Sequence, residues 1–573
     1  MMKWLLVVCM GLLMACGSTP PSASNETAHE KKPEPAATPV TKELIEKAAG
    51  MIDAKRIEDG VKILAHDDMM GRATGTEGER KAAEWIAAQY ESIGLKPLAG
   101  DSFFQKVQLI GMKKNAETSS LTLRGDKGEL KYENGKTLTW WSTAQKEKVA
   151  IEKAPLVFVG YGVDAPEHQW DDYKGLDAKG KILVFLNNDP DIEGEPDAFG
   201  GEARTYYGRY TYKFEQAMSR GAAGAIIIHT THSAGYGWEV IGTSGSRESF
   251  AVKLPDTGFQ LDMLAWMHQD LVNQIAAMVG SDLDAWFKAA NKRDFQPVPL
   301  PVTLDATMEV ALRETEGQNV VGLWEGSDPT LKDEIVIFSA HYDHLGVKDD
   351  GSVYNGAWDN ALGTAAIIDI ARAFAESGLR PRRSIAFLAC SAEERGLLGS
   401  FWFTANPPVP LKRFVANLNI DMPQILGMTH DIGAIGYESN SLGEVLQSIA
   451  AETPVTLADG TSEPMVVKGD PNPNAGSFYR SDQANFVKAG VPAIYFVPGK
   501  SYVETPSTDP SQYHTDHYHK VSDVITEHWD LSGCVRDMRV ILRLTTAVAM
   551  ADEMPRWQPG NEFEGAWKKL HGR

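Results

Sequence analysis

Residues 335–346, with the sequence IVIFSAHYDHLG, decide the fold of this chain. The segment is preceded by a charged pair, begins with an apolar run and ends at glycine, which is typical of a strand buried on both faces of a parallel sheet. His341 and Asp343 follow at the carboxyl end of the strand, where open α/β sheets bind their ligands. Side chains at positions i and i+2 of an extended chain project to the same side. We therefore expect Asp343 to contact the imidazole of His341 and to fix its tautomer, as a carboxylate does behind a metal-binding histidine.

Downstream of residue 301, apolar strand-like runs alternate with helical patterns. Strands are expected at residues 335–339, 384–390, 415–420 and 492–497, and helices at residues 360–376, 441–451 and 531–550. Alternation of this kind predicts an α/β fold, with a mixed, mostly parallel sheet sandwiched by helices.

The part of the chain before this alternation divides into a helical region and a β-rich block. The first helix is expected to begin near Thr41 and to run through Lys55 and beyond. Thr76 with Glu79 predicts a capping box at the start of a later helix. Residues 139–298 contain several strand-like runs but no cluster of potential ligands. We expect them to form an inserted module, with residues 41–138 and 299–560 forming the domain into which it is inserted.

Composition excludes some classes of function. The 573 residues carry 56 Lys and Arg against 77 Asp and Glu, a net charge of −21. Such an acidic chain is not expected to offer a general surface for nucleic acid or for anionic lipid. Too few cysteines are present for a disulfide framework. Cys390 directly continues the apolar run at 385–389 and is expected to be a small buried residue rather than a nucleophile.

The amino terminus predicts export. Residues 1–16, MMKWLLVVCMGLLMAC, combine a basic start with an apolar run too short to span a bilayer, which is typical of a signal peptide. Residues 13–17, LMACG, resemble a bacterial lipobox, which implies that Cys16 is lipidated; an ordinary cleaved signal is the alternative. Residues 17–40 are expected to be a flexible linker. The chain is then expected to be anchored by lipid in the cell envelope, and Gly17 favours the outer membrane, on either its periplasmic or its surface side.

Carboxylates and a histidine follow the other expected strands and loops. Taken singly, each has an ordinary structural explanation as a helix cap, a solvated charge, a turn or a loop histidine. Together they place two histidines and several carboxylates at the carboxyl ends of successive strands of one sheet. The residues are Asp359, the pair Glu393 and Glu394, Asp421, and His519 followed by Asp523.

This set of side chains favours a pair of metal ions. Imidazole and carboxylate without thiolate suit zinc or a neighbouring first-row metal. Two histidines and three carboxylates exceed the three protein ligands of one catalytic zinc, and a carboxylate shared between two ions resolves the count. Of the adjacent pair, one glutamate is then free to act as a general base while the other binds metal.

These residues resemble the co-catalytic dizinc exopeptidase family, which includes secreted bacterial aminopeptidases, plasma glutamate carboxypeptidase and the glutaminyl cyclases. The resemblance covers most of the mature chain, and it implies that residues 139–298 are a protease-associated domain. It also implies two zinc ions per chain. One would be bound by His341, Asp359 and Asp421, and the other by Asp359, Glu394 and His519.

The resemblance implies further roles. Glu393 would be the general base and Asp343 would orient His341. The family's last motif is His-x-x-x-Asp, which His519 satisfies with Asp523, whereas His514 and His517 do not. The segment 479–482 resembles the family's substrate side, and its tyrosine would stabilise the oxyanion.

The expected function is that of a zinc aminopeptidase acting on peptides. A glutaminyl cyclase-type transferase, a carboxypeptidase and a non-catalytic receptor-like protein remain as alternatives, because a metal site does not decide which peptide terminus is held. The oligomeric state is left open.

Overall fold

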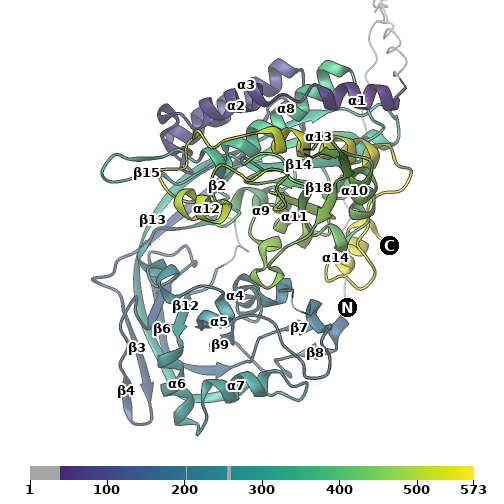
Figure 1. Ribbon diagram of the computed structural model, residues 1–573. Helices are drawn as coiled ribbons and strands as arrows, with labels where there is room; N and C mark the ends of the chain where they lie inside the picture. Colours follow the sequence, from purple (N-terminus) through teal and green to yellow (C-terminus); the bar gives the residue numbers. More distant parts are fainter. Residues whose placement is uncertain (1–38, 202, 254–259, 458) are drawn as a thin grey trace, which may run out of the picture. The chain divides into compact units, whose positions relative to one another are not determined.

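The computed structural model describes residues 39–201, 203–253, 260–457 and 459–573 (Figure 1). The predicted signal peptide, Cys16 and nearly all of the predicted linker lie outside the described residues. Within them, no helix combines the length and the apolar character needed to cross a membrane.

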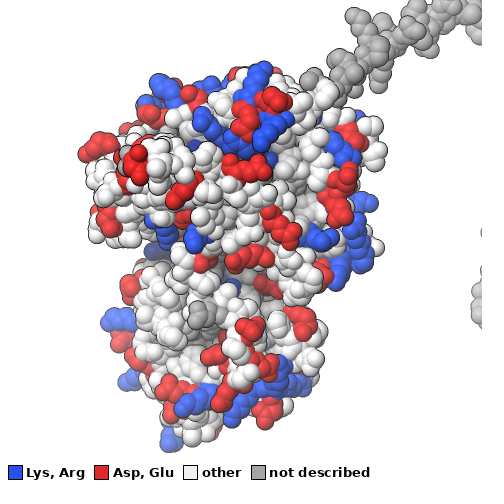
Figure 2. All heavy atoms as spheres, turned by 45° about the vertical axis from the view of Figure 1, so that its right-hand side comes forward, with Lys and Arg blue, Asp and Glu red and all other residues white. Residues whose placement is uncertain are grey.

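Acidic and basic side chains are interspersed over the face shown in Figure 2, so the negative net charge is not gathered into a single patch there.

A mixed sheet forms the centre of the fold, as the sequence predicts. Its strands follow the order β11 (Ser249–Val252), β2 (Phe104–Lys114), β13 (Val298–Trp324), β17 (Ser384–Cys390), β14 (Ile335–His341), β18 (Phe414–Ile420), β23 (Ala493–Val497), β19 (Asp431–Ile435) and β22 (Val466–Lys468). The four strands β17, β14, β18 and β23 are parallel, and antiparallel pairs with β13 and β19 flank them. The predicted α/β fold is confirmed.

Helices cover both faces of this sheet because its central strands are apolar on both sides. Along β14, Val336 and Phe338 belong to one apolar core, and Ile335 and Ile337 belong to another on the opposite face. The first face is covered by α1 (Lys42–Gly50), α2 (Ala54–Leu64), α3 (Glu77–Ile93), α8 (Leu362–Ser377), α10 (Leu442–Ala451) and α13 (Ser532–Met550) (Figure 1). The second is covered by α9 (Leu398–Ala405) and α11 (Gln483–Lys488), and Cys390 is buried there as predicted.

The predicted continuous helix from Thr41 through Lys55 is wrong. The helix stops at Gly50, and a second one begins at Ala54 with Asp53 as its N-cap, whose carboxylate accepts from the backbone N of Arg56 at 2.9 Å. Asp369, from α8, accepts from the backbone N of Asp53 at 2.9 Å and from the Nε of Arg56 at 2.7 Å. A buried partner more than 300 residues away therefore sets this break, which local helical propensity does not reveal.

The predicted capping box is also wrong. The hydroxyl of Thr76 donates to the carbonyl of Ala73 at 2.6 Å and makes no bond to the amides of α3. Glu79 is 3% exposed; it accepts from the backbone N of Gly75 and contacts the hydroxyl of Ser391. The carboxylate is thus used to join α3 to the segment that follows β17.

The β-rich block has apolar cores of its own. The first half of β13 pairs with β3 (Ser120–Gly125) and β6 (Lys148–Phe158), and β6 continues through β9 (Ile182–Leu186), β10 (Gly224–His229), β12 (Met263–His268) and β5 (Leu138–Trp141). The α-helices of this block, among the described residues, are α4 (Tyr210–Ser219), α5 (Thr231–Ala234), α6 (Gln269–Met278) and α7 (Leu283–Ala290). Two apolar clusters separate from those of the central sheet fill this block. Its limits as a domain, and its nature as a protease-associated domain, stay predictions.

Candidate metal centre

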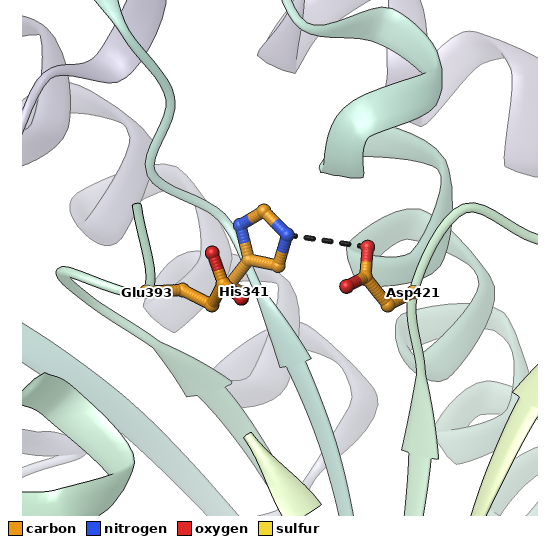
Figure 3. Close-up of side chains that lie close together, drawn as sticks. All are labelled: His341, Glu393 and Asp421. Carbon is orange, nitrogen blue, oxygen red and sulfur yellow. Dashed lines mark hydrogen bonds and ion pairs between the residues drawn. The ribbon is translucent and has the colours of Figure 1, made fainter. Parts of the chain in front are cut away.

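Three neighbouring parallel strands deliver three of the predicted residues to one place. His341 ends β14, Glu393 follows β17 and Asp421 follows β18. Figure 3 shows these side chains meeting at the strand ends, with the Nε2 of His341 3.2 Å from the Oδ1 of Asp421. His341 is 1% exposed and Asp421 is 8% exposed. The three residues offer donor atoms that all lie within 4.8 Å of one another.

Asp359 stands between this group and a second one. Its Oδ1 lies 3.2 Å from the Nε2 of His341, and its Oδ2 lies 3.2 Å from the Nε2 of His519. The Oε2 of Glu394 is also 3.2 Å from the Nε2 of His519. The two oxygens of one buried carboxylate therefore face two different histidines. This divides the five predicted ligands into two sets of three that share Asp359.

The distances between the histidine nitrogens and the carboxylate oxygens match the spacing of ligand atoms around a zinc ion. Two donors that bind one tetrahedral zinc at about 2.0–2.1 Å lie roughly 3.3 Å apart. The measured contacts of His341 and His519 with their carboxylates are all 3.2 Å. In contrast to His519, neither His514 nor His517 forms an ion pair with these carboxylates within the described part of the chain. Metal binding by these residues is still a prediction.

The site gathers more negative than positive charge. Burial would lower the pKa of His341, but Glu393 and Asp421 outweigh burial and raise its pKa well above the ordinary value. Burial raises the pKa of Glu393, and the nearby charges of Glu394 and Asp421 add to the rise, which leaves it well above the ordinary value. Crowding of carboxylates in a buried place is costly unless cations balance them. Divalent ions provide that balance.

Left-handed backbone occurs at three non-glycine residues of the site, as it does at several others elsewhere in the described chain. Ala392 (φ 56°), Met422 (φ 52°) and His519 (φ 57°) adopt positive φ although none is glycine. Each such residue costs on the order of 1–3 kcal/mol, and residues of this kind cluster at functional sites. Here they adjoin Glu393 and Asp421 and include His519 itself.

Asp343 holds more than one part of the site. The Nδ1 of His341 is 3.2 Å from the backbone carbonyl oxygen of Asp343 and 3.9 Å from the Oδ1 of Asp343. The carboxylate accepts from the backbone N of Glu393 at 3.0 Å and from that of Glu394 at 3.3 Å. The predicted contact with His341 is thus made mainly through the backbone of Asp343. The side chain fixes the turn that carries both glutamates.

Asp523 positions the shared carboxylate. Its two oxygens accept from the backbone N of Trp358 at 2.9 Å and from that of Asp359 at 3.0 Å. Burial raises the pKa of Asp523 to about 6. The aspartate of the His-x-x-x-Asp motif therefore acts on the segment of Asp359, far away in sequence.

Sequence reasoning missed Arg72, which is fully buried behind the site. Its guanidinium donates to the carbonyl oxygens of Leu64 (2.5 Å), Tyr342 (2.5 Å), Asn355 (2.7 Å) and Gly356 (2.8 Å). It therefore ties the end of β14 to the segment that precedes Asp359. Burial lowers its pKa to about 10, so the group stays charged at neutral pH. Backbone carbonyls leave no sequence signal, which is why no pattern identified it.

His344 was also missed, although it lies within the quoted segment. It is fully buried, and His344, Asp359 and Glu394 offer donor atoms within 4.8 Å of one another. Its Nδ1 is 2.9 Å from the Oε1 of Glu394. The one available signal was its position one residue after Asp343.

The predicted oxyanion role of Tyr479 does not agree with its hydrogen bonding. Its hydroxyl donates to the carboxylate of Glu562, and the residue is 8% exposed. The ring packs against Tyr206 of the β-rich block with centroids 5.9 Å apart. Since the hydroxyl is already used, Tyr479 is assigned no role in the chemistry.

Comparison with known proteins finds a family model that matches the part of the chain carrying these residues. The model of peptidase family M28 matches residues 319–544. Leupeptin-inactivating enzyme 1 of Streptomyces exfoliatus is 28% identical over 192 residues, which is 33% of this chain and 37% of the enzyme. Aminopeptidase NAALADL1 of Mus musculus is 37% identical over 109 residues, or 18% and 13% of the two chains. A probable glutamate carboxypeptidase, AMP1 of Arabidopsis thaliana, is 30% identical over 161 residues, or 25% and 21%. The chain thus spans less than half the length of each of these relatives.

Solved structures also resemble the chain. The aminopeptidase from Aneurinibacillus sp. strain AM-1 has a TM-score of 0.48 at 18% identity, covering 88% of this chain and 96% of that one. BSAP, a zinc aminopeptidase from Bacillus subtilis, has a TM-score of 0.39 at 20% identity, covering 86% and 94%.

Proposed function

We propose that this chain, whose residues 319–544 belong to peptidase family M28, is a two-zinc exopeptidase that removes single residues from the amino termini of peptides. The observation that carries the proposal is the placement of the Asp359 carboxylate: one of its oxygens faces His341 and the other faces His519. A carboxylate placed in this way is suited to bridge two ions. A single catalytic zinc would have no use for the second set of ligands.

Each zinc ion has three protein groups available. His341, Asp359 and Asp421 would hold one, and Asp359, Glu394 and His519 would hold the other. Zinc in such a site lowers the pKa of water and polarises a carbonyl group. Asp523 and Asp343 keep the ligand-bearing segments in place through the backbone amides of Asp359 and of the two glutamates.

Glu393 is the residue that moves the proton. It lies beside His341 and Asp421 at the ends of the strands (Figure 3). Its carboxylate accepts a proton from the attacking water and returns it to the nitrogen of the leaving amine, so that it acts first as a base and then as an acid.

The choice of peptide terminus rests on the relatives. The names of the mouse relative and of both solved structures include aminopeptidase, which supports removal of amino-terminal residues. The name of the Arabidopsis relative includes glutamate carboxypeptidase, so carboxypeptidase activity is the second candidate. Peptides with free and with blocked amino termini distinguish the two activities. Cleavage only of free amino termini supports the proposal, and cleavage regardless of an amino-terminal block contradicts it.

Glu393→Gln tests the mechanism in the same assay. It removes the proton acceptor but preserves the size of the side chain, so we expect zinc content to be kept and kcat to fall about 100- to 10,000-fold. Glu91→Gln, at an exposed position of α3, is the matched control and should leave kcat unchanged. Near-normal turnover by the Glu393 variant would show that another group is the base.

We also propose that the chain is exported and anchored by lipid at Cys16. The motif at residues 13–17 supports this, and these residues lie outside the described part of the structure. Cys16→Ser should abolish incorporation of labelled fatty acid and move the protein to the soluble fraction. A variant that stays with the membrane and keeps its label would contradict the anchor.

A further inference from the structure

His344 is a buried imidazole with one notable neighbour. It is 0% exposed, and its Nδ1 lies 2.9 Å from the Oε1 of Glu394. The contact does not meet the geometry of a regular hydrogen bond, and neither atom has another hydrogen-bond partner among the described residues. The Nε2 of His344 has none either. A fully buried polar ring of this kind is costly unless a specific partner uses it.

The two oxygens of Glu394 face opposite partners. Oε2 lies 3.2 Å from the Nε2 of His519, within the second proposed set of zinc ligands. Oε1 faces His344. Because Asp359, Glu394 and His519 already supply three protein groups there, a fourth protein ligand would close the position that a catalytic zinc keeps for water.

We infer that His344 is a positioning residue for the second zinc: its imidazole pairs through Nδ1 with the Oε1 of Glu394 and leaves Oε2 of that carboxylate available to the metal. The inference rests on the proposed two-zinc function. Two adjacent residues would then position Glu394. The carboxylate of Asp343 accepts from the backbone amides of Glu393 and Glu394, and the imidazole of His344 contacts the Glu394 side chain. Groups that orient a metal ligand in this way typically change metal affinity 10- to 100-fold when they are removed.

Three variants at this position separate positioning from direct ligation. His344→Asn keeps an N–H donor near the place of Nδ1, whereas His344→Gln places its amide near Nε2, and His344→Ala removes the donor altogether. The measurement is zinc affinity of the metal-free full chain by chelator competition, which needs no substrate. His66→Ala, at a side chain that is 62% exposed, is the control.

We expect the loss of affinity to affect only one of the two zinc ions. The Ala and Gln variants should bind one zinc with wild-type affinity and the other about 10- to 100-fold more weakly. The Asn variant should recover most of that loss. If the Ala variant does not fold, the Gln and Asn variants still provide the comparison.

Two outcomes overturn the inference alone. Unchanged affinity for both ions in the Ala and Gln variants would show that His344 plays no part. An Asn variant as weak as the Gln variant would show that the imidazole itself is a ligand. A wild-type chain that binds no zinc would instead overturn the proposed function, and this inference with it.

Discussion

Replacing Glu79 by Gln should make the folded protein more stable at alkaline pH. Glu79 is 3% exposed and has no Lys or Arg within ion-pair distance among the residues that the structure describes. Its neighbours are the backbone N of Gly75 and the hydroxyls of Ser391 and Tyr342, the last at 3.5 Å. Since Ser391 lies two residues before Glu393, this contact supports the turn that carries the proposed base.

The sign of the effect follows from the direction of the pKa shift. Burial raises the pKa of Glu79 from 4.5 to about 8. The unfolded chain therefore releases this proton near pH 4.5, while the folded chain keeps it until about pH 8. Between these values the folded state binds more protons, so the contribution of Glu79 to stability falls as pH rises. Each pKa unit corresponds to about 1.4 kcal/mol, so the accumulated loss above pH 8 is on the order of 5 kcal/mol.

A glutamine has the shape of the protonated acid and cannot ionise. We expect Glu79→Gln to differ from the wild type by less than about 1.5 kcal/mol at pH 5, and to be more stable by several kcal/mol at pH 9. The assay is urea-induced unfolding of the metal-free proteins at both pH values, with Glu91→Gln as an exposed control on the same helix. Equal differences at the two pH values, or a variant that is less stable at pH 9, would refute the reasoning.

Two further substitutions test how the ligand-bearing segments are held. Arg72→Met removes the donor to four buried carbonyl oxygens, of which only that of Gly356 keeps another donor within the described chain, the backbone N of Ala361. It should therefore lower the free energy of unfolding by at least about 3 kcal/mol in urea titration, and a loss under 1 kcal/mol would contradict this. Asp523→Ala leaves the amides of Trp358 and Asp359 without their acceptor, and zinc affinity measured by chelator competition should fall about 10- to 100-fold. Asp516→Ala, in the same segment but exposed, is the control, and equal affinities of the two variants would show that Asp523 does not position Asp359.

The central strands were predictable because their signal is local. An uninterrupted apolar run is a strong sign of a strand buried on both faces, and β17 has the predicted bounds, residues 384–390. The strands β2 and β13 were not predicted. Parts of each strand alternate between buried and less buried positions, and other parts are largely exposed, so neither strand has a long uninterrupted apolar run along its whole length. Their pairing also joins segments about 200 residues apart in the sequence. Pairing of that kind depends on the partner strand more than on local sequence.

The residues of the candidate site also differ in whether local sequence could reveal them. Residues that directly follow apolar strands, such as His341 and Asp421, were found because a parallel sheet brings strand ends together. Arg72 and His344 were not found, because their partners are backbone carbonyls or a carboxylate distant in sequence. Glu79 was assigned to a helix cap because Thr76 stands at the expected spacing, whereas its partner Ser391 lies 312 residues away.

The most direct test of the two-metal account is the number of zinc ions bound per chain, measured together with their affinities. We expect two zinc ions in the wild type. Asp421→Ala and Glu394→Ala should each weaken a different ion, and Asp359→Ala should weaken both, because its carboxylate faces both histidines. A wild-type chain that binds only one zinc, or an Asp359 variant that keeps one ion at wild-type affinity, would contradict the account.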